Sequence, residues 1–439
     1  MAKKDAKVGA RVKVLASNFS GEGFMGEAPL SLRERVLKLK LKSGYDIGVS
    51  KDKIKSLREL SGEKIKASKR ALVKPVVVSK KGIALVATGG TISNRVDYRT
   101  GAVSPIMEPK EFLGLVPELS NFANIKKLYR PFTIASEELT FKDYEKLCEV
   151  VYDALNSKDG KKLYGLVVTH GTDVLHFTSA ALSFALRGLD RPIAVTGAQR
   201  SSDRASFDGA QNLICSAIYA TSDICEVATV LHGSSNDDYC LAIRGTRSRK
   251  MHTSRRDAFR PINDLPLAKV WPDGRIENIG SFRKKGEGEE KFVLRNKFSD
   301  KVGFIHFVPS MGPELLDYYL DRGYEGVIVC GTGLGHVAVQ PFDKKKSWLE
   351  AFERARQKRV FVGMVGQNYG RVHTNVYTNL RLIAEKGVTY LEDMSYEAAY
   401  MKLSWVLGQT KNLEEVKKMM LTNYAGEFKE RSFEGEFLY

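Results

Sequence analysis

The chain has no long hydrophobic run. None of its 439 residues lies in an apolar stretch of the roughly 18 residues that a membrane-spanning helix needs. The first residues, "MAKKDAKVGARVKVLASNFSGEG", carry charge but lack the apolar core of a secretory signal. These absences argue against a membrane protein and a secreted one, and we expect a cytoplasmic protein.

Cysteines are few and are not paired in sequence. The five stand singly, without a CxxC pair and without a histidine at metal-binding spacing: Cys148, Cys215, Cys225, Cys240 and Cys330. We therefore expect reduced thiols and no metal site. A catalytic cysteine is an alternative that no flanking motif supports.

Common nucleotide-binding and hydrolase motifs are also missing. No GK[ST] follows Gly89-Gly90-Thr91, so this turn is not a P-loop. Gly331, Gly333 and Gly335 follow an apolar run, but a GxGxxG motif needs glycine where His336 stands. There is no serine elbow G-x-S-x-G. The pattern argues against nicotinamide or flavin binding and against a serine hydrolase.

Positive charge is concentrated at the N-terminus. The net charge is +17, and residues 1–80 hold 20 lysines and arginines but only 8 acidic residues. A local excess of this kind is typical of contact with nucleic acid or another acidic surface. A solvated, lysine-rich small domain is the alternative, and the sequence favours neither.

The N-terminal segment has the pattern of short strands. Apolar and charged residues alternate in Val36–Leu41, and Ser43-Gly44 is typical of a hairpin turn. A glycine-rich loop is predicted at Gly21–Gly26, and the charged stretch Ser56–Pro75 is predicted to be a linker. We expect a small β-barrel or sandwich near residues 5–60, within an N-terminal unit of residues 1–75.

From Lys80 onward, apolar β-branched runs alternate with helical stretches. This alternation predicts βαβ units and parallel sheets covered on both faces. A less regular patch suggests a boundary within residues 270–295. We therefore predict two α/β domains, at residues 80–275 and 295–439.

Three predicted strand ends carry similar polar residues. They are Thr88–Thr91, Thr169–Asp173 and Thr196–Arg200, each following an apolar run. Because parallel strands deliver their carboxyl ends to one edge of a sheet, we expect these turns to converge. Two threonines, a carboxylate and main-chain amides at one edge suggest acyl-transfer chemistry.

A threonine nucleophile needs a base, and glycine turns let main-chain N–H groups stabilise an oxyanion. Asp173 is suited either to accept from a substrate ammonium or to orient a lysine base. The alternative for Thr172 and Asp173 is that they only cap the next helix. A structural role is a simpler interpretation than a catalytic one for the histidines His170, His232 and His252.

The best candidate for the base is Lys250, in "LAIRGTRSRKMHTSRRDAFRP". Crowding by like charge favours the neutral amine of a lysine. The neighbouring arginines in this sequence are Arg244, Arg247, Arg249, Arg255 and Arg256. The alternative is an exposed basic loop.

Taken together, "ATGGTIS", "VVTHGTDVLHFTSAALSF" and "PIAVTGAQRSSDRASFDGAQNL" resemble the asparaginase family of amidohydrolases over residues 80 to about 435. The resemblance implies two α/β domains, with the site at the carboxyl edge of the first domain's sheet, and a homodimer. It also implies hydrolysis of a side-chain amide through an acyl-enzyme, without cofactor or metal.

By position, the resemblance makes Thr91 the nucleophile, in the place of the threonine of the family's TGGTI motif. Thr172 and Asp173 match the HGTD motif, and Lys250 matches the lysine that completes the Thr-Asp-Lys group. These four are the predicted catalytic residues.

The same resemblance implies substrate-binding residues. Tyr98 matches the lid tyrosine, although its spacing from the nucleophile is shorter than in the periplasmic-type enzymes. Ser136 and Glu137 fit the positions that hold the α-carboxylate and α-ammonium. Gly90 and Gly171 are further substrate-binding positions, and amides near Gly90 and Thr172 are expected to hold the oxyanion. Some members reach across the dimer with an asparagine near Gly331 to His336; Leu334 stands there, so that contact is not expected.

The N-terminal extension narrows the resemblance. "GEGFMGEAPLSLRERVLKLKLKSGYDIGVS" and "KMHTSRRDAFRPINDLPLAKV" resemble asparaginase-like subunits of archaeal tRNA-dependent amidotransferases. Such a subunit frees ammonia from glutamine or asparagine for an E-type partner, which uses ATP and Mg²⁺ and mainly holds tRNA(Gln). The implied assembly is a homodimer within a heterotetramer.

Two alternatives remain open: a free-standing cytoplasmic L-asparaginase, and a basic RNA-binding module fused to a decayed amidohydrolase. Each expected catalytic residue type is present, which argues against decay. Direct contact of the N-terminal domain with tRNA is a hypothesis.

Overall fold

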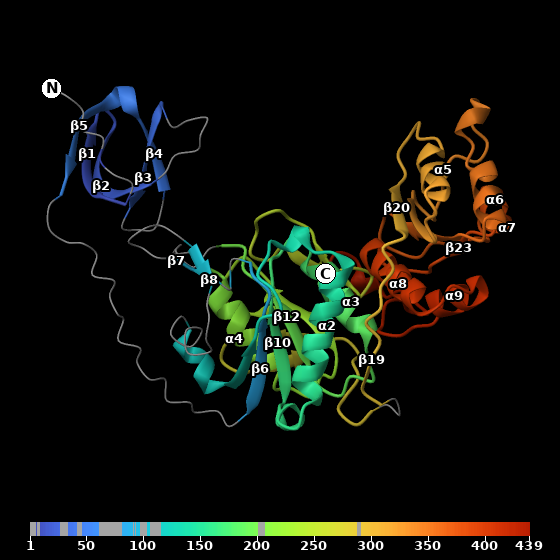
Figure 1. Ribbon diagram of the computed structural model, residues 1–439, viewed down its shortest axis with the longest axis horizontal. Helices are drawn as coiled ribbons and strands as arrows, with labels where there is room; N and C mark the ends of the chain where they lie inside the picture. The colour runs from blue at the N-terminus through green and yellow to red at the C-terminus, as the bar shows by residue number, and fades with distance from the viewer. Residues whose placement is uncertain are drawn as a thin grey trace.

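The computed structural model describes most of the chain (Figure 1). The described residues are 6, 9–26, 34–41, 46–60, 81–90, 92, 94–96, 103–105, 116–200, 207–287 and 291–439. Thr91 and Tyr98, the Ser43-Gly44 turn and most of the predicted linker lie outside them.

The N-terminal unit is an antiparallel sheet of five strands in the order β4-β3-β2-β1-β5. The strands are β1 (Arg11–Ala16), β2 (Phe19–Gly26), β3 (Val36–Leu41), β4 (Asp46–Ser50) and β5 (Ile54–Glu59). The expected small β unit is therefore confirmed. Within its described residues the edge strands β4 and β5 do not pair with each other, so no closed barrel is seen there.

Two local predictions in this unit are wrong. The predicted loop at Gly21–Gly26 belongs to β2, and the predicted linker begins inside β5. Gly23 has a packing reason to be in a strand, because a Cβ there would lie 2.4 Å from the carbonyl oxygen of Lys40. The lack of a side chain at Gly23 permits close approach of β3, and this glycine does not mark a turn.

The first α/β region is built on an eight-stranded sheet in the order β18-β17-β14-β13-β12-β10-β6-β9. Its strands are β6 (Gly82–Ala87), β9 (Asn124–Tyr129), β10 (Gly165–Thr169), β12 (Ile193–Thr196), β13 (Val227–His232), β14 (Cys240–Arg244), β17 (Ala268–Val270) and β18 (Ile276–Asn278). From β9 to β13 all neighbours are parallel, as predicted.

The other end of this sheet is antiparallel, which the sequence did not predict. β14 follows β13 through a short loop, and β17 and β18 pair in the same way. A short connection can only join antiparallel neighbours, because a parallel crossover needs a dozen or more residues.

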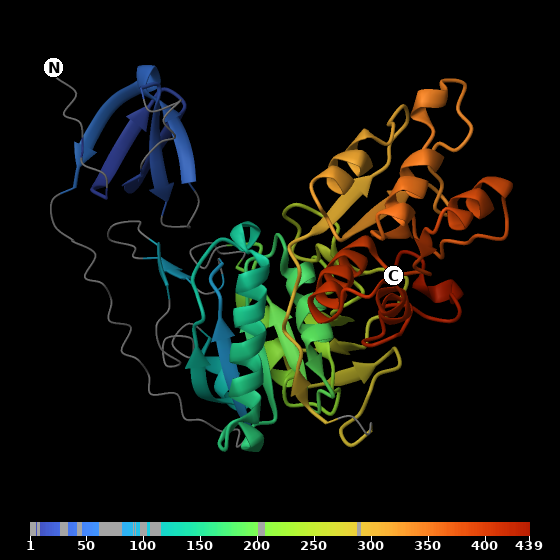
Figure 2. The same ribbon diagram turned by 45° about the vertical axis from the view of Figure 1, so that its right-hand side comes forward.

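Helices cover both faces of the parallel strands (Figures 1 and 2). α2 (Phe141–Asn156) and α3 (Leu175–Ala185) pack with Val86 and Val168 on one face. α4 (Gly209–Tyr219) packs with Leu85 on the other face. Alternate residues of each strand therefore serve two cores, which explains the continuous apolar runs.

The second α/β region has a parallel sheet in the order β20-β21-β22-β23. These strands are β20 (Val302–His306), β21 (Gly326–Gly331), β22 (Phe361–Gly366) and β23 (Thr389–Tyr390). The helices are α5 (Glu314–Asp321), α6 (Leu349–Gln357), α7 (Thr378–Glu385), α8 (Tyr396–Gln409) and α9 (Leu413–Met420).

Short two-stranded ribbons complete the fold. They are β7 (Asn94–Val96) with β8 (Val103–Pro105), β11 (Leu186–Arg187) with β19 (Val293–Leu294), and β15 (Ser248–Lys250) with β16 (Phe259–Pro261). The predicted domain limits themselves stay a prediction.

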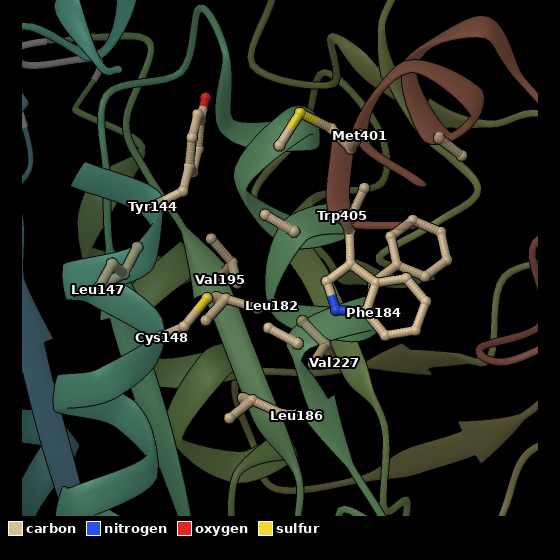
Figure 3. Close-up of a cluster of buried hydrophobic side chains, with 14 of the residues drawn as sticks. Tyr144, Leu147, Cys148, Leu182, Phe184, Leu186, Val195, Val227, Met401 and Trp405 are labelled. Carbon is tan, nitrogen blue, oxygen red and sulfur yellow. The ribbon is translucent and has the colours of Figure 1, made fainter. Parts of the chain in front are cut away.

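The two α/β regions share one hydrophobic core. It joins α2 and α3 of the first region to α8 and the sheet of the second. Figure 3 shows the rings of Phe184, from α3, and Trp405, from α8, side by side; their centroids are 5.9 Å apart. The interface between α3 and α8 therefore holds the two regions together.

Among the described residues no helix is long and apolar enough to cross a membrane. The five cysteines are buried, and none of them forms a disulfide. Burial raises the pKa of the Cys225 thiol to about 11 and that of Cys330 to about 12.

Candidate functional site

Three strand ends meet at the carboxyl edge of the first sheet. β10 lies between β6 and β12, and Thr169 is in register with Ala87 on one side and Thr196 on the other. The Thr88 hydroxyl donates to the Thr169 carbonyl at 3.1 Å, and the His170 amide donates to the Thr196 carbonyl at 2.8 Å. The predicted convergence of the three turns is confirmed.

Glycines allow these turns to touch. Gly90 has a φ of 75°, and a Cβ on it would lie 2.6 Å from the amide nitrogen of Gly171. A Cβ on Gly171 would lie 2.8 Å from the Ser136 hydroxyl oxygen, and one on Gly197 would lie 2.9 Å from the Thr172 methyl carbon. Any side chain at these positions would separate the loops that form the site.

Lys250 joins this edge from the β15–β16 ribbon. Its Nζ donates to Thr172 Oγ1 at 2.9 Å and to Asp173 Oδ1 at 2.7 Å. The lysine side chain is only 10% exposed, so it does not lie in an exposed basic loop. Asp173 is 64% exposed, which leaves the carboxylate accessible to a ligand while it holds the lysine.

Thr172 and Asp173 do not cap the following helix. The N-cap of α3 is Val174, without a side-chain hydrogen bond. The Thr172 hydroxyl instead donates to Gln199 Oε1 at 3.4 Å. The alternative interpretation of these two residues as helix caps is therefore wrong.

Gln199 and Asp208 are neighbours of the site that sequence reasoning did not single out. The buried Asp208 carboxylate accepts from the backbone amides of Gln199 and Arg200, at 3.0 and 2.9 Å. It thereby fixes the turn after β12. Their only sequence signal is the polar run after this strand, which does not show which side chain turns inward.

The arginines that lie near Lys250 in sequence were expected to crowd it with like charge; in the structure their charges are compensated. Every arginine of that group is paired with a carboxylate. The pairs are Arg244 with Glu226 and Asp264, Arg247 with Asp393, Arg249 with Glu397, Arg255 with Asp257, and Arg256 with Asp237. Because most of these acids lie far away in sequence, only the fold shows that the positive charges are compensated.

The structure places Ser136 against the site. It is buried beneath Gly171, and its hydroxyl donates to Glu137 Oε2 at 3.4 Å. Glu137 itself is exposed. Gly90 reaches the same edge, whereas Thr91 and Tyr98 lie outside the described residues.

The histidines near the site have structural contacts. His170 Nδ1 donates to the Gly171 carbonyl at 2.7 Å, and its Nε2 accepts from the Thr178 hydroxyl at 3.0 Å. Burial lowers the pKa of His170 to about 4, so the ring is neutral at pH 7. His232 binds Asn212 and Asp237, and His252 accepts two backbone amides.

No group of three His, Cys, Asp or Glu side chains in the described ranges is arranged to hold a metal ion. What the edge offers is a lysine amine in contact with a threonine hydroxyl and a carboxylate. A lysine in that position is suited to exchange a proton with a hydroxyl, and backbone amides at glycine turns are suited to hold an oxyanion.

Comparison with known families identifies the class of protein to which this fold belongs. Residues 82–281 match the "Asparaginase, N-terminal" family, and residues 301–420 match the "Glutaminase/Asparaginase C-terminal domain". The chain belongs to the asparaginase family, and within it to the D subunits of glutamyl-tRNA(Gln) amidotransferase.

The second part of that assignment comes from curated relatives. The D subunit of glutamyl-tRNA(Gln) amidotransferase from Pyrococcus abyssi is 48% identical over 397 residues, covering 89% of this chain and 87% of that protein. The one from Methanopyrus kandleri is 42% identical over 431 residues, covering 96% and 91%. The similarity therefore includes part or all of the N-terminal β unit.

Solved structures show the same fold. The thermostable L-asparaginase from Thermococcus kodakarensis superposes with a TM-score of 0.70 at 27% identity, and L-asparaginase I from Vibrio cholerae with 0.65 at 25%. Each match covers 80% of this chain and 100% of the other.

Proposed function

We propose that this chain is the subunit of a glutamyl-tRNA(Gln) amidotransferase that hydrolyses glutamine, or asparagine, and supplies ammonia for conversion of Glu-tRNA(Gln) to Gln-tRNA(Gln). The observation that carries the chemistry is the contact of Lys250 with Thr172 and Asp173 at the edge where three glycine turns meet. The D-subunit relatives, which match along about nine-tenths of the chain, support the biological role.

In the proposed reaction, Thr91 attacks the side-chain amide carbon. Lys250 and Thr172 relay the proton from the nucleophile toward the leaving nitrogen, and ammonia departs from an acyl-enzyme that water then hydrolyses. Amides near Gly90 and Thr172 hold the oxyanion. No metal or cofactor is proposed for this chain.

The amino acid is proposed to be held by its α-groups. Asp173 and Glu137 are proposed to take the ammonium, and the exposure of both side chains supports this role. Ser136 lies under Gly171, where its hydroxyl is suited to bind the α-carboxylate. Tyr98 is assigned to the lid by its position in sequence alone.

The partner in this proposal is an E-type subunit that uses ATP and Mg²⁺ to activate the glutamate on the tRNA and makes most of the tRNA contacts. The complex is proposed to be a heterotetramer around a homodimer of this chain, acting in the cytoplasm. Both its assembly and its location stay predictions.

The test is glutamine-dependent formation of Gln-tRNA(Gln) by the purified chain with its partner, ATP and Glu-tRNA(Gln). We expect ammonia release to rise when the partner and the charged tRNA are present. Thr91→Ala should abolish the reaction with glutamine but leave it intact with added ammonium chloride, because only ammonia supply is lost. Unchanged glutamine hydrolysis by Thr91→Ala, or full uncoupled turnover by the chain alone, would contradict the proposal.

A free-standing L-asparaginase is the second candidate, favoured by the two solved asparaginases that share the fold. Asparagine and glutamine differ by one methylene, worth about 1 to 3 kcal/mol in a fitted pocket. A strong preference for asparagine, with turnover indifferent to the partner, would favour this candidate.

A further inference from the structure

The strand that carries Lys250 is weakly supported by its own sheet. Among the described strands, β15 pairs only with β16, in a two-stranded ribbon in which Lys250 is opposite Phe259. An isolated two-stranded hairpin is at best marginally stable in water. Contacts from elsewhere in the fold must therefore set the position of the lysine.

Helix α3 of the first region packs on β15, and further contacts come from the second α/β region. Neighbouring side chains of a strand point to opposite faces, so Arg249 leaves β15 on the side away from Thr172. Its Nε donates to Glu397 Oε1 at 2.5 Å and its Nη2 to Glu397 Oε2 at 2.9 Å. The guanidinium also lies 4.3 Å from the centroid of the Tyr396 ring.

This pair is buried and bidentate. The Glu397 side chain is 2% exposed and the Arg249 side chain 15%. Burial alone would lower the pKa of Arg249, but the hydrogen bonds and the charge of Glu397 outweigh it and raise that pKa. A two-point contact between planar groups fixes orientation as well as distance.

A second buried pair holds the chain just before β15. Arg247 is fully buried and donates to the Asp393 carbonyl at 2.9 Å and to Asp393 Oδ2 at 3.0 Å. Its Nε donates to the Gly426 carbonyl at 2.9 Å. Asp393 lies just before α8, so this residue and the first turn of the helix each contact the lysine-bearing segment.

The same helix also packs on the element that follows Thr172 and Asp173. α3 begins directly after this turn, and α8 lies along it through Phe184 and Trp405 (Figure 3). α8 therefore contacts both the segment that carries Lys250 and the helix that follows Thr172 and Asp173. Its first turn, with Glu397, is nearest to the lysine strand.

We propose that Glu397 is a positioning residue for amide hydrolysis: through its bidentate ion pair with Arg249 it holds β15 so that the Lys250 amine meets Thr172. The second α/β region thus takes part in the active site of the first. This inference rests on the proposed function, because it assigns a purpose to the position of Lys250.

The first test is Glu397→Gln, which keeps the shape of the side chain but removes its charge. A displacement of about 1 Å in a reacting group is enough to slow a reaction about a hundredfold. We expect kcat for glutamine hydrolysis to fall about ten- to a hundredfold, with KM changed less than about twofold, because substrate contacts stay in place.

A double variant separates positioning from stability. Arg249→Met with Glu397→Leu leaves no unpaired buried charge, and an apolar replacement of a buried ion pair is often neutral for stability. If the pair positions the lysine, the double variant should unfold at the same urea concentration as the wild type but should still have a low kcat. If the pair is only structural, both stability and kcat return to the wild-type values, and the inference is wrong.

Two further variants complete the series. Arg249→Lys keeps the charge but loses the two-point contact, and should give an intermediate kcat. The matched control is Glu392→Gln, since Glu392 precedes α8 on the same segment and pairs with Arg371. The control should keep the wild-type kcat; an equal loss there would overturn the assignment to Glu397.

Lys250→Met, measured in parallel, distinguishes failure of the proposed function from failure of the positioning role alone. If the wild type hydrolyses no amide, or Lys250→Met remains active, the proposed function itself fails. If those two behave as expected while Glu397→Gln keeps kcat within about twofold, which is below 0.5 kcal/mol in barrier height, only the positioning role fails.

Discussion

At the scale of single residues, Gly90 combines a left-handed backbone with a very close neighbour. Gly90→Ala would place a Cβ 2.6 Å from the amide nitrogen of Gly171, so one of the two loops must move. We expect kcat/KM for glutamine to fall by at least about a hundredfold, because a shift of about 1 Å in this loop misplaces the oxyanion donors. Steady-state ammonia release measures this.

The control for Gly90→Ala is Gly323→Ala. Gly323 has a similar φ of 69°, but beyond its chain neighbours no described residue has an atom within 4 Å of the position that its new methyl group would take. The substitution therefore brings backbone strain without a clash. It should destabilise the protein by about 1 kcal/mol and leave kcat/KM unchanged. Equal activity losses in both variants would mean that strain, and not the close approach to Gly171, is responsible.

His176 makes stability depend on pH. Burial lowers its pKa from 6.5 to about 4, although Glu397 opposes this; Arg249, Lys250 and His170 act in the same direction as burial. The folded state therefore resists protonation more than the unfolded one. The contribution of His176 to the free energy of unfolding is fully present above about pH 6.5. It falls by about 3 kcal/mol as the pH falls to about 4.

His176→Phe should remove this part of the pH dependence. The ring packs against Phe177 and Phe259, and Nδ1 has no hydrogen-bond partner among the described residues, so phenylalanine suits the site. Urea unfolding between pH 7.5 and 4.5 should show a shallower decline than in the wild type. The exposed His306, changed to Gln, is the control; an unchanged decline in His176→Phe would contradict the prediction.

How much of the site could be predicted depends on how local each contact is. Thr172, Asp173 and Lys250 could be placed together because turns after parallel strands converge and because their motifs are familiar. The pairing of Arg249 with Glu397 could not, since the two are 148 positions apart and no local pattern links them. The carboxylates that compensate Arg247 and Arg249 near Lys250 could not be predicted, for the same reason.

At the scale of secondary-structure elements, the packing of α3 on α8 determines how the two α/β regions unfold. Trp405→Ala removes a fully buried ring and leaves the Arg295 carbonyl without the indole donor, 2.7 Å away in the wild type. Loss of the ring should cost about 3 to 5 kcal/mol. Urea unfolding followed by circular dichroism should show one transition, shifted to lower denaturant.

Trp271→Ala is the matched control, because Trp271 is only half-buried, in contact with Tyr239 and Arg275. It should cost about 1 kcal/mol. Two separate transitions in the wild type would contradict the view that the shared core joins the regions.

The elements were predictable where the pattern was simple. Continuous apolar runs identified β6, β10 and β12 as buried parallel strands, since both faces of the sheet are covered by helices. The antiparallel end of the sheet was missed, because β17 and β18 have only three residues each. Glycines misled the prediction at β2, where they allow close strand pairing.

At the scale of the whole molecule, the basic N-terminal sheet is the candidate for contact with tRNA. Leu37 and Leu39 of β3 are buried, whereas Lys38 and Lys40 alternate with them. Charge reversal of Lys38, Lys40 and Lys42 should weaken tRNA binding and reduce the salt dependence of the affinity, by about 0.7 to 0.9 in log–log slope for each phosphate that the variant no longer neutralises. Binding titrations of the full complex at several salt concentrations measure this.

An unchanged salt dependence of tRNA affinity in this triple variant would show that the N-terminal sheet does not contact tRNA. A matched charge reversal at Lys344, Lys345 and Lys346, in the second α/β region, is the control for a general effect of net charge. If both triple variants reduce the slope equally, the effect belongs to the whole molecule and not to the N-terminal sheet.

The five buried thiols can report on local opening of the folded chain. Alkylating reagents attack the thiolate, so a cysteine shielded in a core reacts only when its surroundings open. Cys148 and Cys215 report on opposite faces of the first sheet, and Cys330 reports on the second. Mass spectrometry can follow the order in which these cysteines are labelled. That order would show whether the two α/β regions open separately or together, without an introduced probe.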